Sequence, residues 1–262
     1  MSPHRHQPDS SQAALRRPPT AGIDPAWSRL LLLDGFRLEW AGHQRDLPRS
    51  AQRVLALLAL SGRPGRAGVA GQLWPEVNEK RALGSLRTVL HRIQINCPDI
   101  VRSCGDHLEL AGSVLVDFSE VTSWALSALS DGPGDAVDPA ALRVPPGAYR
   151  GTLLPGWYDE WVLLEREQFC QLRMHALEET SARLAGVGRY GEALYAAHSA
   201  VRAAPLRESA HRAVISIHLA EGNITEAVRQ YESFRDMLRT EVGAEPSPLM
   251  KRLLGPFAEP VP

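Results

Sequence analysis

The chain contains no long uninterrupted hydrophobic run. None of its apolar segments approaches the roughly 18 residues that a helix needs to span a bilayer, and the first thirty residues lack the apolar core of a secretory signal sequence. Those residues are rich in proline, serine and arginine, which predicts a disordered tail over residues 1–28, and a second short tail is expected over residues 256–262. We therefore expect a cytoplasmic protein that does not interact with membranes.

Cysteine is scarce as well. The three cysteines, Cys97, Cys104 and Cys170, do not form the pattern of a disulfide framework in a chain of 262 residues. Two of them lie near His91 and His107, which leaves zinc as one interpretation, but their spacing is not the C-x₂₋₄-C of structural zinc sites. We expect no metal and no other cofactor, and we place Cys170 in the core because it falls on an apolar helical stripe.

The sequence motifs of common enzyme classes are missing too. The glycine-rich segment "GRPGRAG", residues 62–68, lacks the Gly-Lys-Ser/Thr ending of a phosphate-binding loop. The chain contains no G-x-S-x-G, H-E-x-x-H or G-x-G-x-x-G motif. We therefore predict no catalytic residue and no enzymatic activity.

Charge is present but unevenly distributed. The formal net charge of −1 indicates nothing about a partner. Residues 45–92, however, contain nine cationic and three acidic side chains, a local charge of +6, whereas residues 157–255 contain twelve cationic and fourteen acidic ones, a charge of −2. This asymmetry predicts an anionic partner for the first region only.

The first region shows strands, three helices and a hairpin in that order. Short strands are predicted around the Asp34-Gly35 turn, a helix between Pro48 and Gly62, a short helix over residues 66–74 and a basic amphipathic helix from near Lys80 to residue 96. A hairpin around residues 105–106 and one more strand follow. This order is typical of an α+β winged helix-turn-helix domain, which we place at residues 29–116.

The second region is predicted to be an all-α domain over residues 117–255. A Pro/Gly-rich stretch, residues 131–147, is either a flexible linker or a structured bend, and the many apolar residues after it favour the bend. A long helix over residues 158–185 precedes two segments, "GRYGEALYAAHSA" and "GNITEAVRQYESF", that are offset by 34 residues, the tetratricopeptide period. The aromatic cluster of Trp157, Tyr158 and Trp161 is either a ligand pocket or packing, and packing is favoured.

The basic helix has one apolar and one cationic face. At about 100° per residue, residues 82, 83, 86, 89, 90 and 93 form an apolar stripe, and the opposite face carries no acid. A solvated surface helix is the plain interpretation, but the local charge and the position before a hairpin favour insertion into a DNA major groove. Gly84 supports this interpretation. Glycine inside a helix costs about 1 kcal/mol relative to alanine, and a surface that no other molecule approaches closely would carry alanine at lower cost.

The predicted DNA contacts divide between bases and phosphates. Arg87, near the centre of the helix, suits guanine O6 and N7. Ser85, Thr88 and His91 are short enough for base edges or thymine methyl groups. The predicted phosphate contacts are Lys80, Arg81 and Arg92 at the rim of the helix and, as secondary candidates, Arg49, Arg53, Arg102 and His107.

The chain resembles the Streptomyces antibiotic regulatory protein family between about residues 30 and 254. The resemblance rests on the segment that begins "LPRSAQRVLALLALSG" and, most specifically, on "LLPGWYDEW" and "EAVRQYESFRDMLRTEVGAEPSP". It implies an OmpR-type winged helix joined to a tetratricopeptide-like bacterial transcriptional activation domain. The recognition helix of the family corresponds to residues 80–94.

This resemblance implies an activator of a specialised-metabolite (antibiotic) biosynthetic gene cluster. Family members bind short direct repeats in double-stranded DNA as a side-by-side pair of protomers and recruit RNA polymerase holoenzyme, which implies association with the nucleoid. Larger relatives carry an ATPase module, and we expect no nucleotide hydrolysis here. The helix ends "HRIQI" where many relatives are more basic, which predicts weaker or more selective binding. The alternative function is a protein-interaction adaptor with vestigial DNA binding.

Overall fold

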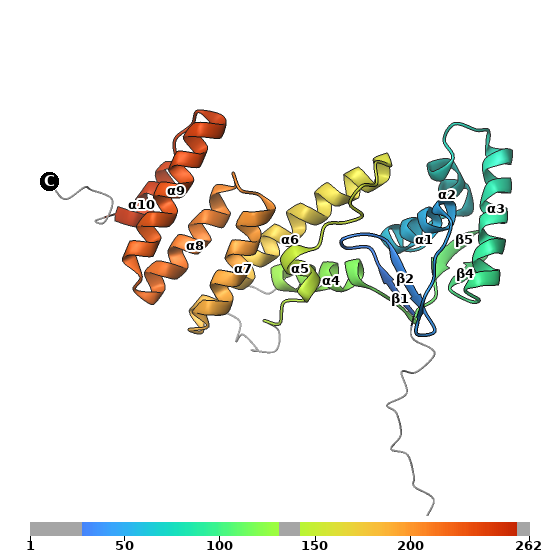
Figure 1. The fold of residues 1–262 in the computed structure, drawn as a ribbon, viewed down its shortest axis with the longest axis horizontal. Helices are drawn as coiled ribbons and strands as arrows, with labels where there is room; N and C mark the ends of the chain where they lie inside the picture. Colours follow the sequence, from blue (N-terminus) through green and yellow to red (C-terminus); the bar gives the residue numbers. More distant parts are fainter. Residues whose placement is uncertain (1–27, 131–141, 256–262) are drawn as a thin grey trace, which may run out of the picture.

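The fold consists of a β-rich N-terminal part followed by a row of helices (Figure 1). The computed structural model describes residues 28–130 and 142–255. It confirms the predicted fold class, an α+β winged helix-turn-helix followed by an all-α, tetratricopeptide-like part. The predicted tails lie outside the described residues, except for Ser28. Most of the Pro/Gly-rich stretch also lies outside them. Ser28 itself belongs to the first strand rather than to a tail.

A four-stranded sheet opens the N-terminal part. Its order is β3-β2-β1-β6, with β2 antiparallel to both of its neighbours and β6 parallel to β1. The turn between the first two strands places Asp34 and Gly35 at positive φ, as the Asp-Gly signal predicts. The strands are β1 (Ser28–Leu31), β2 (Arg37–Trp40), β3 (His43–Gln44) and β6 (Val114–Val116).

Three helices and a hairpin lie between β3 and β6, as predicted. The helices bury Leu55, Leu58 and Leu86 almost completely against one another. The hairpin is fixed to the connection between the first two helices, because the Leu108 amide donates to the Pro64 carbonyl at 3.0 Å and the Arg66 amide to the Asp106 carbonyl at 2.9 Å. The elements are α1 (Arg49–Ser61), α2 (Arg66–Leu73), α3 (Glu79–Asn96), β4 (Val101–Cys104) and β5 (His107–Leu110).

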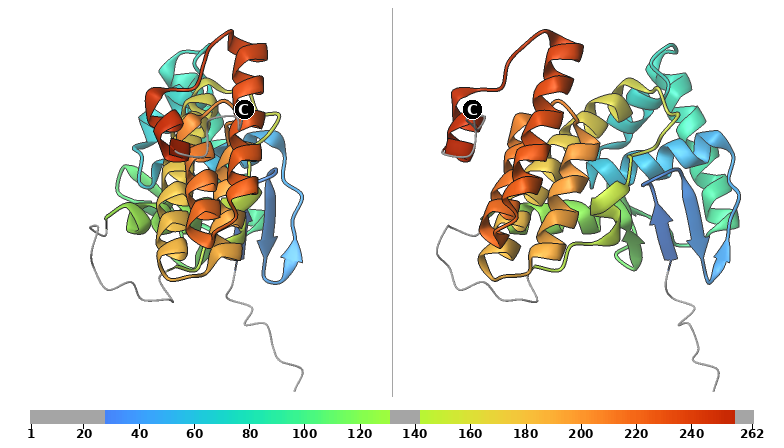
Figure 2. Two further views of the ribbon diagram at one scale, coloured as in Figure 1. Left: turned by 90° about the vertical axis from the view of Figure 1, so that its left-hand side faces the viewer. Right: turned by 60° about the vertical axis from the view of Figure 1, so that its left-hand side comes forward.

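The C-terminal part is a row of helices in which α6 to α9 pack consecutively (Figure 2). Helices α7 and α9 start 34 residues apart, at Tyr190 and Ile224, which matches the repeat in the sequence. The repeated Ala193 and Ala227 are fully buried, where a small side chain lets neighbouring helices approach closely. The helices are α4 (Asp117–Ser130), α5 (Pro146–Arg150), α6 (Glu160–Gly186), α7 (Tyr190–Ala203), α8 (Glu208–Glu221), α9 (Ile224–Val242) and α10 (Pro248–Leu254).

A non-helical segment, residues 151–157, contacts both parts, and we call it the strap. The Leu154 amide donates to the Leu32 carbonyl at 2.8 Å, and the Asp34 amide donates to the Thr152 carbonyl at 2.8 Å. Leu33 and Leu153 form an antiparallel bridge. The strap thus continues the pairing of the chain just after β1, and one hydrophobic cluster runs from the sheet through α1–α3 to α6. The division at residue 116 stays a prediction, because the two parts share this core.

Arg166 of α6 holds the strap in place. Its Nε donates to the Leu153 carbonyl at 2.7 Å, and its Nη2 donates to the carbonyls of Leu154 and Trp157 at 2.6 and 3.0 Å. These carbonyls are in a largely buried segment, so each would be costly without a donor. On the other side of the junction, the Asp117 carboxylate accepts the Leu32 and Leu33 amides at 2.8 and 3.0 Å.

The aromatic residues next to the strap are mostly packing, as predicted. Trp157 is 4% exposed and lies against Phe36 and Trp161. Tyr158 is the exception, since 82% of it is exposed. Cys170 is half-buried rather than a full member of the core. No helix in residues 28–130 or 142–255 has both the length and the apolar character needed to cross a bilayer.

The strap leaves no room at Gly151. A Cβ atom there would lie 2.8 Å from the Gly147 carbonyl oxygen and 2.9 Å from Leu33. We expect Gly151→Ala to lower the free energy of unfolding by about 1–3 kcal/mol, because the strap or Leu33 must shift. Urea unfolding of the full chain measures this. Gly71→Ala is the matched control, since a Cβ there meets nothing within 4 Å, and it should be neutral or stabilising. Equal stability of Gly151→Ala and the parent chain would contradict the tight contact.

Candidate nucleic-acid interface

Helix α3 is anchored by its apolar face and leaves its cationic face in solvent. Ala82, Leu86, Val89 and Ile93 are at most 5% exposed. Helix α3 lies at the end of the molecule opposite α10, so the helical part does not cover it (Figure 1). Of the predicted contacts on this helix, Ser85 is half-buried and the others are exposed, namely Lys80, Arg81, Arg87, Thr88, His91 and Arg92.

The start of α3 is fixed by a side-chain cap. The Asn78 side-chain oxygen accepts the Arg81 amide at 3.0 Å, which satisfies one of the free donors of the first turn. Glu79 in the same turn is the acid that the helix dipole favours there. The cap determines where the helix begins and thereby which residues lie on the exposed face. After this first turn the exposed face carries no acid; beside its cations and small polar groups it also presents Ile95, which is 66% exposed.

The cations of α3 have no acidic partner within the described part of the chain. Neither Lys80, Arg81, Arg87 nor Arg92 forms a salt bridge there. Elsewhere in the same structure arginine is commonly paired, for example Arg207 with Glu178 at 2.8 Å. The α3 face therefore offers several guanidinium donors that nothing in these residues neutralises.

Gly84 has open space where a side chain would be. A Cβ atom built on it meets nothing within 4 Å. Packing within the described residues therefore gives no reason for glycine at this position. The Thr88 hydroxyl donates to the Gly84 carbonyl at 3.1 Å, the i−4 bond common for threonine in helices.

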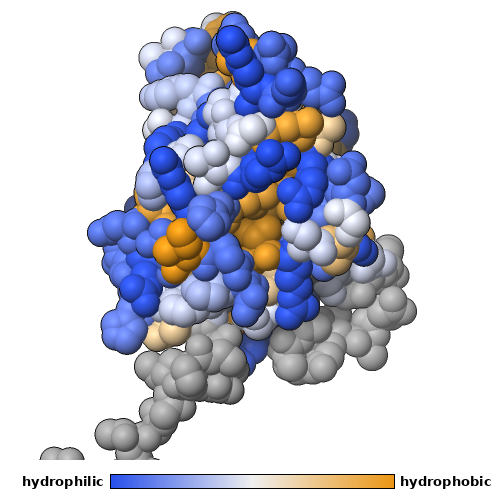
Figure 3. All heavy atoms as spheres, turned by 90° about the vertical axis from the view of Figure 1, so that its right-hand side faces the viewer, coloured by the Kyte–Doolittle hydropathy of each residue, from blue (hydrophilic) through white to orange (hydrophobic). Residues whose placement is uncertain are grey.

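The face that carries α3 is mostly hydrophilic, with hydrophobic residues showing near its centre (Figure 3). Arg102 and His107 on the hairpin are exposed, as their predicted role requires. Two arginines, one just before α2 and one at its first residue, hold the hairpin in place. Arg63 pairs with Glu109 at 2.7 Å, and Arg66 donates to the Ser103 hydroxyl at 2.8 Å. The hairpin is therefore a braced element beside α3.

Arg49 and Arg53 have partners within the protein, and their predicted phosphate contacts stay predictions: the Arg53 side chain is 23% exposed and that of Arg49 is 50% exposed. Arg53 Nη2 lies 2.5 Å from Asp159 Oδ1, and its Nη1 donates to the Leu73 carbonyl at 2.9 Å. The Arg49 guanidinium lies 3.5 Å from the centre of the Trp157 ring, with its Nη2 3.8 Å from Asp159 Oδ2. Burial lowers the pKa of Arg49, although Asp159 acts in the opposite direction. We call these four side chains the latch. The sequence carried no signal for their pairing, because the partners are more than 100 residues apart.

The two N-terminal cysteines do not form a metal site. Cys97 is buried, and burial raises the pKa of its thiol, whereas Cys104 is exposed and donates to Glu109 at 3.3 Å. Among residues 28–130 and 142–255 we find no group of three or more His, Cys, Asp and Glu side chains that could hold a metal ion.

Comparisons with known proteins identify the family of the C-terminal part and support the fold. Residues 118–255 match the family described as the bacterial transcriptional activator domain. Among solved structures, the chain is similar to Mycobacterium tuberculosis EmbR in complex with a low affinity phosphopeptide, with a TM-score of 0.60 and 17% sequence identity. The similarity covers 90% of this chain and 66% of that chain, so this chain spans just under two thirds of its length. No curated protein matches the sequence.

The latch is expected to stabilise the junction between the two parts. Asp159→Ala removes the carboxylate from Arg53, whose side chain is only 23% exposed. We expect this to lower the free energy of unfolding by about 1–3 kcal/mol, since a mostly buried guanidinium loses its partner. Glu226→Ala is the matched control, because Glu226 also lies at a helix N-terminus but pairs with Arg229, whose side chain is 75% exposed, and it should cost less than about 1 kcal/mol. Equal losses in urea unfolding would show that the latch contributes no more than a surface ion pair.

Proposed function

We propose that this chain, which belongs to the bacterial transcriptional activator domain family, is a transcriptional activator of the Streptomyces antibiotic regulatory protein type that reads DNA through α3. The observation that carries this proposal is the solvent-exposed face of α3, whose cations have no acidic partner in the described residues. Double-stranded DNA supplies the missing anions at regular spacing. A helix of this width fits the major groove.

The side chains of α3 differ in what they would contact. We propose that Arg87, near the centre, donates two hydrogen bonds to guanine O6 and N7, while Thr88 and His91 meet neighbouring base edges. Ser85 is half-buried and is the least accessible of the proposed base contacts. The proposed phosphate contacts, which position the helix without reading sequence, are Lys80, Arg81 and Arg92, with Arg102 and His107 of the hairpin.

The finer features of the function are also proposals. We propose that two protomers bind direct repeats side by side and that the helical part recruits RNA polymerase holoenzyme at the promoter of a specialised-metabolite gene cluster. Two segments support this by their resemblance to the Streptomyces antibiotic regulatory protein family, namely "LLPGWYDEW" and the segment that begins at Glu226. Stacked helical repeats, which commonly bind protein partners, support the contact with polymerase.

Retardation of a promoter fragment from the neighbouring gene cluster tests DNA reading. Affinity should fall steeply as salt rises, because phosphate contacts release condensed counterions. The full chain is needed, since deleting residues 118–255 would also remove the strap and α6, which cover the core of the N-terminal part. Absence of salt-dependent binding would favour the adaptor with vestigial DNA binding.

Arg87→Ala tests the proposed base contact. We expect a loss of about 1–3 kcal/mol in binding free energy on the specific site and a relaxed preference at one base pair. Arg229→Ala is the control, because Arg229 is an exposed arginine of α9, far from α3. Equal weakening on specific and random DNA would make Arg87 a phosphate contact instead.

Gly84 allows stability and DNA binding to be separated. Gly84→Gln should raise the free energy of unfolding by about 0.5–1 kcal/mol, because glutamine is the better helix former and the space is open. The same change should weaken specific DNA binding roughly tenfold, or about 1.4 kcal/mol, because the side chain lies where DNA would approach. Gly186→Gln at the end of α6, where a Cβ also meets nothing, should leave DNA binding unchanged. A stabilised Gly84→Gln variant with undiminished affinity would refute close approach at this position.

A further inference from the structure

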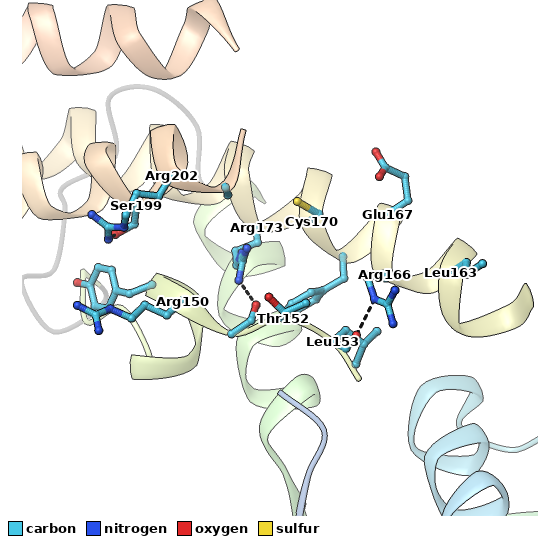
Figure 4. Close-up of a pocket in the computed structure, with 14 residues that line it drawn as sticks. Arg150, Thr152, Leu153, Leu163, Arg166, Glu167, Cys170, Arg173, Ser199 and Arg202 are labelled. Atoms are coloured by element: carbon cyan, nitrogen blue, oxygen red, sulfur yellow. Dashed lines mark hydrogen bonds between the residues drawn. The ribbon is translucent and has the colours of Figure 1, made fainter. Parts of the chain in front are cut away.

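A cavity of about 750 Å³ lies between α5, the strap, α6 and α7 (Figure 4). Its volume is in the range of small-molecule binding sites, about 300–1,000 Å³. The activity proposed above makes no use of it. The cavity therefore needs an explanation of its own.

The cavity has both apolar and cationic walls. Leu163 of α6, which is 44% exposed, supplies apolar surface, and the buried Leu153 and Phe169 also line the cavity. Four guanidinium groups from three helices also line it, and Figure 4 shows those of α5 and α7 at one end: Arg150 of α5, Arg166 and Arg173 of α6, and Arg202 of α7. Such a mixture suits a molecule with an apolar body and a charged group.

Negative charge is almost absent from these walls. Glu167 is the one carboxylate that lines the cavity, its oxygen accepts a hydrogen bond from the Gln171 amide, and in Figure 4 it points away from the strap. None of the four arginines forms an ion pair within the residues that the structure describes. The Arg202 Nη2 donates instead to the neutral Ser199 hydroxyl at 2.6 Å.

Arg173 is the most constrained of the four. It is 7% exposed, and its Nη1 donates to the Gly151 carbonyl of the strap. Its buried Nε has no hydrogen-bond partner. Burial lowers the pKa of Arg173, while Cys170 and Asp34 act in the opposite direction. A buried cation with an unused donor is costly unless a charge or acceptor compensates it.

We propose that this cavity binds a small organic acid, whose carboxylate or phosphate lies among Arg150, Arg173 and Arg202 and whose apolar body packs on Leu163. Guanidinium groups bind both anions through charge-assisted hydrogen bonds. A DNA duplex is too wide for a cavity of this volume, and its proposed contacts lie on α3 at the end of the molecule. The bound acid touches the strap, whose residues 152–154 also pair with residues 32–34 of the N-terminal part.

Isothermal titration of the full chain with octanoate, octyl phosphate and 1-octanol tests the proposal. At least one of the two anions should bind saturably at one site, and roughly tenfold or more tightly than the alcohol, because charge-assisted hydrogen bonds are about twice as strong as neutral ones. The comparison of octanoate with octyl phosphate identifies which anion the site prefers. Inorganic phosphate, which lacks the apolar body, should bind more weakly than octyl phosphate.

The variant Arg150→Gln/Arg202→Gln removes two charges from exposed positions and should weaken the anion that binds roughly tenfold or more. Arg229→Gln on α9 is the matched control and should leave binding unchanged. Urea unfolding of both variants tests that they remain folded. Absence of saturable anion binding, equal binding of the alcohol, or undiminished binding by the double variant each overturns the proposal. Promoter binding is measured in parallel, so that failure of this site is distinguished from failure of DNA reading.

Discussion

The guanidinium of Arg166 makes the contact on which the rest of the structure depends. Its three hydrogen bonds to the carbonyls of Leu153, Leu154 and Trp157 satisfy acceptors in a segment that is otherwise largely buried. Without them the strap would lose its donors where water has little access, and an unpaired buried carbonyl costs about 1–3 kcal/mol. The same strap pairs with the chain after β1 and carries Trp157 onto α1. One side chain of the helical part thereby secures the junction with the N-terminal part.

This junction explains why the two parts cannot be treated as independent modules. The apolar face of helix α1 packs in the shared core, and Arg53 near its N-terminus pairs with Asp159. Helices α2 and α3 pack in turn on α1. The position of the cationic face is therefore set relative to the helical row. Packed elements, and not only the chain between them, therefore connect the strap with α3.

Local patterns in the sequence predicted most of the fold but not the junction. Apolar spacing identified α3, the Asp-Gly and Gly-Asp pairs identified turns, and the 34-residue offset identified α7 and α9, because each signal depends on neighbours in the chain. The pairing within the latch was not predicted, for the opposite reason. Arg49 and Arg53 lie on an exposed edge of a helix in any local view, and only the tertiary fold brings Asp159 and Trp157 to them. The exposure of Tyr158 between two packed tryptophans was equally invisible.

The arginines of this chain differ in what neutralises them, and that difference identifies where external partners belong. Arg53 has a carboxylate and Arg166 has three carbonyls, so both are structural. The guanidinium groups on α3, and those of Arg150, Arg173 and Arg202 in the cavity, have no carboxylate within the described residues, and like charges gathered without counter-charge oppose folding. An anion from outside lowers the electrostatic repulsion within such a group of guanidinium side chains. The exposed set on α3 would match an extended polyanion, whereas the set that lines the cavity beside the strap would match a small anion. The two proposals thus follow from the same electrostatic argument applied to surfaces of different shape.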